Sequence, residues 1–146
     1  MVAPVSQGTI NRLRASVVFA TLPELCVTSP FLGKAGLSLA FEGEAGQILP
    51  TMTGGVTSPE PYQFATVEIH LLKSQALADA YKAQIENDVN VGTINVIGDA
   101  ATMEEWQLQN CIIMSEAPGA FDGNNPEFVV RIRGIYYVNR ALWTAA

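Results

Sequence analysis

The sequence is poor in charged residues, in histidine and in cysteine. Charged residues make up 15% of its 146 positions, against 49% apolar residues. This balance excludes intrinsic disorder, which requires low hydrophobicity and high charge. One histidine, His70, and two distant cysteines, Cys26 and Cys111, do not supply the ligand clusters that bind zinc or haem. We therefore expect no metal and no other cofactor.

Long apolar runs and sorting signals are also missing. The apolar stretch at residues 17–20 is far shorter than the roughly 20 residues that a membrane-spanning helix needs. Residues 1–7 lack the basic start and apolar core of a secretory signal. The sequence thus predicts a soluble protein made in the cytoplasm, with no membrane partner. Its length corresponds to a single domain, residues 1–146, that can bury a core.

Basic residues are few and unevenly placed. Eight Lys and Arg against fourteen Asp and Glu give a net charge of −6. This argues against tight nucleic-acid binding, because such binding needs cations that neutralise phosphates. Residues 1–40 carry three cations and one acid, residues 41–128 carry two and thirteen, and residues 129–146 carry three and none. The segregation is either chance or a charge-complementary contact between subunits.

Alternation of apolar and polar side chains predicts a mainly β fold. Strands are expected at residues 10–20, 24–29, 36–43, 62–72, 91–97, 103–114 and 127–139. Within the strand at 103–114, the alternation places Asn110 on the same face as Leu108, and Cys111 on the opposite face. The expected architecture is a small antiparallel β-sandwich or barrel.

Helical spacing of apolar residues occurs once, over residues 74–88. Ser74 is a candidate N-cap. Leu77, Tyr81 and Ile85 recur at intervals of four residues and form one apolar stripe. We expect this single α-helix to pack its stripe on the sheet as a lid, with its charged positions facing solvent.

Residues 43–61 contain four glycines and three prolines and show no sustained period, which predicts a long surface loop. The loop also carries four apolar residues, Ile48, Leu49, Met52 and Val56. It is therefore too apolar for a solvated linker. Because long loops in small domains usually have a function, we expect it to dock on another surface.

Motifs for catalysis are scarce. There is no phosphate-binding glycine loop and no metalloprotease or serine-hydrolase motif. His70 and Cys111 are a conceivable base and nucleophile, but both lie in strand patterns and no third residue orients them. A strand-surface histidine and a buried thiol are the preferred interpretation. Glu104 and Glu105 are adjacent on a strand and point to opposite faces, which favours a solvated edge over a catalytic pair.

The order of elements over residues 36–139 carries a family resemblance. A Gly/Pro-rich loop leads into a long strand and the helix, and a further strand follows. Leucine, glutamine, asparagine and cysteine then occupy 108–111, before a turn-rich insertion and a last long strand. In this order the chain resembles the tail tube proteins of contractile-tailed bacteriophages, which are related to the inner-tube protein of type VI secretion systems and to siphophage tube proteins.

The resemblance implies a structural subunit rather than an enzyme. It implies hexameric rings stacked into a tube in the phage tail of the virion, assembled in the host cytoplasm. Its partners would be the tail sheath, baseplate and tail terminator proteins, and viral DNA would pass through the lumen during ejection without specific binding. One chain has too few strands to enclose duplex DNA, whereas a ring of several chains has enough. The inner wall would be β-sheet, and the helix would face outward.

Two sets of residues follow as candidates. Alternation sends one set of polar side chains away from the core, where they would line the lumen: Ser38, Glu42, Thr66 and Glu68. Arg12, Arg14, Arg131 and Arg133 fall on similar faces, and pairing with Glu42 and Glu68 across strands would keep the wall near neutral. The other set would contact a neighbouring ring or subunit: Ile48, Leu49, Met52 and Val56. An outer-surface location for the polar set, a type VI-like inner tube and a small-ligand-binding β-barrel remain open alternatives.

Overall fold

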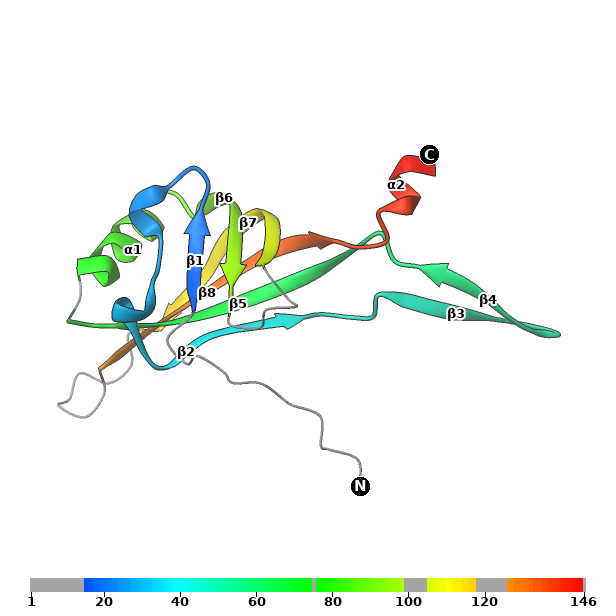
Figure 1. The fold of residues 1–146 in the computed structure, drawn as a ribbon, viewed down its shortest axis with the longest axis horizontal. Coiled ribbons are helices and arrows are strands. Elements are labelled where there is room, and N and C mark those ends of the chain that lie inside the picture. Colours follow the sequence, from blue (N-terminus) through cyan, green and yellow to red (C-terminus); the bar gives the residue numbers. More distant parts are fainter. Residues whose placement is uncertain (1–14, 75, 99–104, 118–125, 146) are drawn as a thin grey trace, which may run out of the picture.

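The protein forms a curled antiparallel sheet, a half-barrel, with one long helix (Figure 1). The computed structural model describes residues 15–74, 76–98, 105–117 and 126–145. The strands are β1 (Ser16–Phe19), β2 (Leu32–Phe41), β3 (Gly46–Thr51), β4 (Gly54–Pro59), β5 (Tyr62–Leu72), β6 (Asn90–Ile97), β7 (Glu105–Ala117) and β8 (Glu127–Tyr137). The helices are α1 (Ala76–Asn87) and α2 (Ala141–Ala145), with 3-10 turns η1 (Pro23–Leu25) and η2 (Ser29–Phe31). The predicted mainly β fold with a lid helix is confirmed.

Six strands form the main sheet in the order β1-β6-β7-β8-β5-β2, and every neighbouring pair is antiparallel. The ring centroids of Phe41 on β2 and Trp106 on β7 lie 5.3 Å apart, although β8 and β5 separate these strands in the sheet. The sheet must therefore curl, with this contact on its concave side. Within the described residues it does not close, because β1 and β2 are its two outermost strands.

The core lies on the concave side of the sheet, where α1 covers it. On β5 the buried side chains Ala65, Val67, Ile69 and Leu71 alternate with residues that point to the opposite face, as the sequence predicts. Leu77 and Tyr81 of α1 are buried in the same core. Tyr81 donates its hydroxyl hydrogen to the carbonyl oxygen of Leu25 at 2.8 Å, and burial raises the pKa of that phenol.

The segment at 24–29 is not the strand that the sequence predicts. Pro23 begins the 3-10 turn η1, because its ring fixes φ near the helical value. The amide of Cys26 then closes the turn on the carbonyl of Pro23 at 3.3 Å. Only Val27 pairs with the sheet, through an isolated bridge to Val17.

The predicted alternation along β7 fails at Asn110. This residue has φ 50°, and the register between β6 and β7 shifts where Gly92 faces Cys111. Such a bulge offsets the alternation by one residue. Leu108 and Cys111 are therefore both buried, and Asn110 is exposed.

The predicted loop at 43–61 is also wrong as a description of backbone structure. It contains strands β3 and β4, which form a separate two-stranded sheet. Parts of other predictions fall outside the described residues: the first half of the strand at 10–20 with Arg12 and Arg14, Glu104, and residues 118–125 of the turn-rich insertion.

Candidate functional site

The hairpin β3–β4 projects from the half-barrel at the end of the molecule opposite α1 (Figure 1). Its two strands pair from Gly46–Pro59 to Thr51–Gly54, so a two-residue turn joins them, which is a common hairpin geometry. Pro50 is tolerated in β3 because β4 is the only strand paired with it in the part of the chain that the structure describes. The glycines and prolines that predict a loop are thus accommodated in a hairpin without neighbouring strands.

The apolar side chains of the hairpin are unburied within the described parts of this chain. The exposed fraction is 73% for Ile48, 48% for Leu49, 56% for Val56 and 102% for Met52 at the turn. A two-stranded hairpin alone is marginally stable in water, and clustered exposed apolar side chains mark interaction surfaces. The structure therefore brings the four predicted contact residues together on one hairpin.

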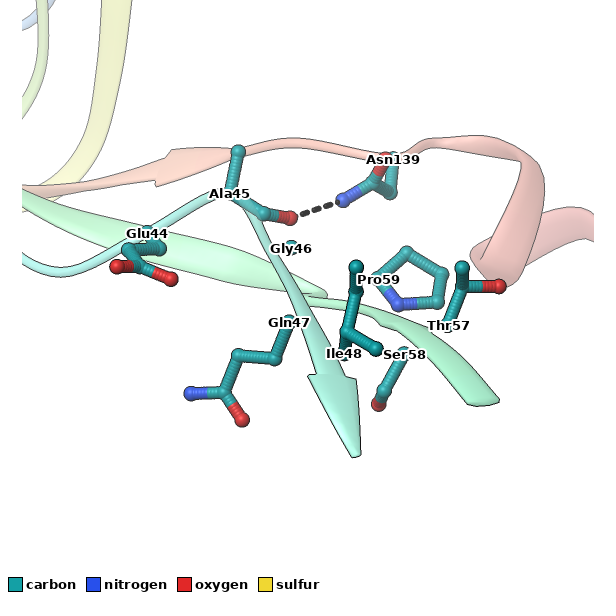
Figure 2. Close-up of a pocket in the computed structure, with 9 residues that line it drawn as sticks. All are labelled: Glu44, Ala45, Gly46, Gln47, Ile48, Thr57, Ser58, Pro59 and Asn139. Carbon is teal, nitrogen blue, oxygen red and sulfur yellow. Dashed lines mark hydrogen bonds between the residues drawn. The ribbon is translucent and has the colours of Figure 1, made fainter. Parts of the chain in front are cut away.

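The root of the hairpin is tied to the chain that follows β8. Figure 2 shows Asn139 facing the two arms, with Ala45 and Pro59 beside it. The side-chain amide of Asn139 donates to the carbonyl oxygen of Ala45 at 2.8 Å and to that of Glu60 at 2.7 Å. The indole Nε1 of Trp143 donates to the carbonyl oxygen of Pro61 at 3.2 Å. An open hollow of about 710 Å³ lies at this root.

The four predicted lumen residues share the convex face of the sheet. Ser38 lies opposite Glu68 and Ala40 lies opposite Thr66 in the pairing of β2 with β5. Glu42 follows β2 and reaches the same face, where its Oε2 meets Arg133 Nη2 at 2.6 Å. Their common face is as predicted, and the presence of a lumen there stays a prediction.

Two of the predicted arginine–glutamate pairs form on this face. Arg131 Nε lies 2.9 Å from Glu68 Oε1, and Arg133 pairs with Glu42 as above. The guanidinium of Arg133 also lies over the ring of Phe64, 4.5 Å from its centroid. Each of these two arginines meets one carboxylate, so the charges within the two pairs cancel.

The structure separates His70 from Cys111. His70 lies on the convex face, with Nδ1 3.1 Å from Glu127 Oε2, whereas Cys111 is buried on the core side. Burial raises the pKa of Cys111 to about 12, so the thiol stays protonated near neutral pH. The two residues do not form a nucleophile–base pair.

Within residues 15–74, 76–98, 105–117 and 126–145, no three His, Cys, Asp or Glu side chains gather as a metal site. In that same part of the chain, no helix has the length and apolarity to cross a membrane.

Comparisons with known proteins give a likeness of fold and none of sequence family. No protein-family model matches the sequence, and no curated protein is significantly similar to it. Among solved structures, the fold is similar to a chain in the cryo-electron microscopy structure of the anti-feeding prophage cap, described as its tube terminating cap. The TM-score is 0.48 and the identity is 17%, over 93% of this chain and 92% of that chain. A superposition this loose assigns no function to this protein.

Proposed function

We propose that the protein is a structural, non-enzymatic subunit that assembles with copies of itself into rings stacked as a tube, as in the phage tails that its sequence resembles. The observation that carries the proposal is the hairpin β3–β4, whose apolar residues Ile48, Leu49, Met52 and Val56 are exposed. Burial of this hairpin on a neighbouring copy would remove its apolar surface from water. Such removal is the main driving force of association. The contact would be heterologous, and such contacts generate rings or filaments.

The open half-barrel supports the same proposal. Strands β1 and β2 are the outermost strands of the main sheet. The outer edge of β1 is bridged by Val27, whereas β2 has no strand beside its outer edge among the described residues. An unpaired strand edge invites pairing with another chain. In a ring, the edges of neighbouring subunits would be covered, and several curled sheets together would enclose a lumen wide enough for duplex DNA.

The finer proposal is a hexameric ring whose convex sheet faces line the lumen. Ser38, Glu42, Thr66 and Glu68 lie on that face, and α1 packs on the opposite, core side. The helix would then point outward, toward a tail sheath. The paired charges of Glu42 with Arg133 and Glu68 with Arg131 would leave a near-neutral wall that viral DNA passes without being held. Baseplate and tail terminator proteins would bind the ends of the tube, in the virion tail.

A small-ligand-binding barrel is the contrasting function. Its site would be the cleft between the open sheet edges, lined by Leu37, Val96 and Trp106 among others, with a volume of about 190 Å³. That volume is below the roughly 300–1,000 Å³ of usual ligand pockets. The size of this cleft therefore does not support a ligand site inside the half-barrel.

Light scattering of the purified full chain tests the proposal. We expect a mass that is a multiple of the 15.7 kDa chain and that grows with protein concentration. A strictly monomeric mass at every protein and salt concentration would overturn it and would favour the ligand-binding alternative.

A further inference from the structure

The direction of the hairpin is determined at its root. Neither β3 nor β4 packs extensively on any other described strand or helix. One backbone hydrogen bond, from the amide of Glu60 to the carbonyl of Ala45 at 3.0 Å, joins the two arms there. This bond holds the arms to each other but does not tie them to the half-barrel.

Asn139 supplies the tie that reaches both sides of the root. Trp143 Nε1, which donates to the carbonyl of Pro61 at 3.2 Å, and Gln63 Nε2, which donates to the carbonyl of Gly43 at 3.3 Å, each reach one side only. A primary amide nitrogen has two hydrogens, and Asn139 Nδ2 uses one for each arm, at Ala45 and at Glu60. Figure 2 shows the bond to Ala45, with the side chain aimed at the hairpin root. Both acceptors are backbone carbonyls, so the contact fixes the path of the chain rather than one side chain.

The backbone of Asn139 is shaped for this contact. Its φ of 49° lies in the left-handed region, which asparagine tolerates better than most residues. Next to it, the amide of Val138 donates to the carbonyl of Pro61 at 3.3 Å. Asn139 therefore lies just after the end of β8, beside the segment that connects the hairpin to β5.

We propose that Asn139 is the positioning residue of the hairpin. Its amide holds both ends of the hairpin root against the end of β8 and so sets the direction in which the hairpin leaves the half-barrel. The inference concerns a contact within one chain. It goes beyond the proposed assembly, for which it would set the geometry, and it can be tested without it.

Three variants separate the amide from the backbone turn. Asn139→Asp keeps the size and the tolerance for positive φ but replaces the donating nitrogen by an oxygen that repels the two carbonyls. Asn139→Gly keeps positive φ and removes the side chain, and it covers the case in which the first variant fails to fold. Asn110→Asp is the matched control, because Asn110 has φ 50° but lies on β7, away from the hairpin.

The readout is a distance distribution between spin labels at Met52→Cys on the hairpin turn and Gln107→Cys on β7, both at exposed positions. Cys26 is replaced by serine. Cys111 is kept, because its buried thiol, with a pKa of about 12, reacts slowly with thiol reagents. Labelled chains are diluted with unlabelled chains, so that the distance within one chain is read whether or not the protein assembles.

We expect one narrow distribution for the parent chain and for Asn110→Asp, and its loss in both Asn139 variants, with circular dichroism unchanged. The proposal is overturned by a broad distribution in the parent chain, by a narrow one in either Asn139 variant, or by equal broadening in Asn110→Asp. A monomeric protein that shows the expected pattern would support this inference and contradict the proposed assembly, so the two failures are distinguishable.

Discussion

At the scale of single residues, Gly134 on β8 lies directly against the side chain of Cys111 on β7. A Cβ atom added to Gly134 would collide with Cys111 Sγ and would lie 3.1 Å from Leu108 Cβ. Gly134→Ala should therefore lower the free energy of unfolding by about 1–3 kcal/mol, as overpacked cores do. Urea denaturation measures the loss. Adding Cys111→Ala should recover much of it, and purely additive losses would contradict the predicted collision.

Leu77 tests the assignment of the helix stripe. Its side chain is 7% exposed and belongs to the core beneath α1. Leu77→Ala should lower the free energy of unfolding by about 2–5 kcal/mol, because truncation leaves a cavity. Lys82→Ala, on the exposed face of the same helix, should change it by no more than about 0.5 kcal/mol. Equal effects of the two substitutions in denaturant titrations would show that α1 packs differently.

Residue patterns predict the core faces well where burial is one-sided and uninterrupted. The alternation of β5 and β8 and the stripe of α1 follow the sequence because one face of each element is buried. The pairing of Glu42 and Glu68 with Arg133 and Arg131 was predictable for the same reason. The two hydrogen bonds of the Asn139 side chain were not predictable, because their acceptors lie 94 and 79 residues away in the sequence. Only the place of Asn139 at a strand end indicates a turn.

At the scale of elements, the hairpin and the β7 bulge explain what the sequence does not predict. All residues of β3 are exposed, so no burial selects an alternating pattern, and the glycines and prolines dominate the prediction. In β7 the left-handed Asn110 shifts the alternation at a point that no apolar pattern marks. Both misses arise where local backbone geometry, rather than one-sided burial, determines the structure.

The hairpin should mediate assembly and contribute little to the stability of the half-barrel. The triple variant Ile48→Ser, Leu49→Ser and Met52→Ser should block assembly while the circular dichroism of the half-barrel stays unchanged. Met114→Ser is the control, because Met114 is similarly exposed, at 56%, on the main sheet. Sedimentation of the assembled fraction measures the effect. An unchanged assembled fraction in the triple variant would refute the role of the hairpin.

At the scale of the whole molecule, the two sides of the sheet should have different roles in an assembled tail. Glu42→Lys with Glu68→Lys would leave Arg133 and Arg131 among new cations, and DNA ejection from particles with this tube should slow most at low salt. Asp79→Lys with Glu86→Lys makes the same charge change on α1, on the other side of the sheet, and should leave ejection unaffected. If Glu42→Lys with Glu68→Lys also left the ejection rate and its salt dependence unchanged, the convex face would not line the lumen.

The central claim, that copies of this chain build rings stacked into a tube, is tested most directly by negative-stain electron microscopy of the purified full-length protein. The account predicts end-on views of rings with a central lumen and side views of tubes with a regular axial repeat. Fields that contain only particles the size of a single 15.7 kDa chain, at every protein and salt concentration, would contradict it.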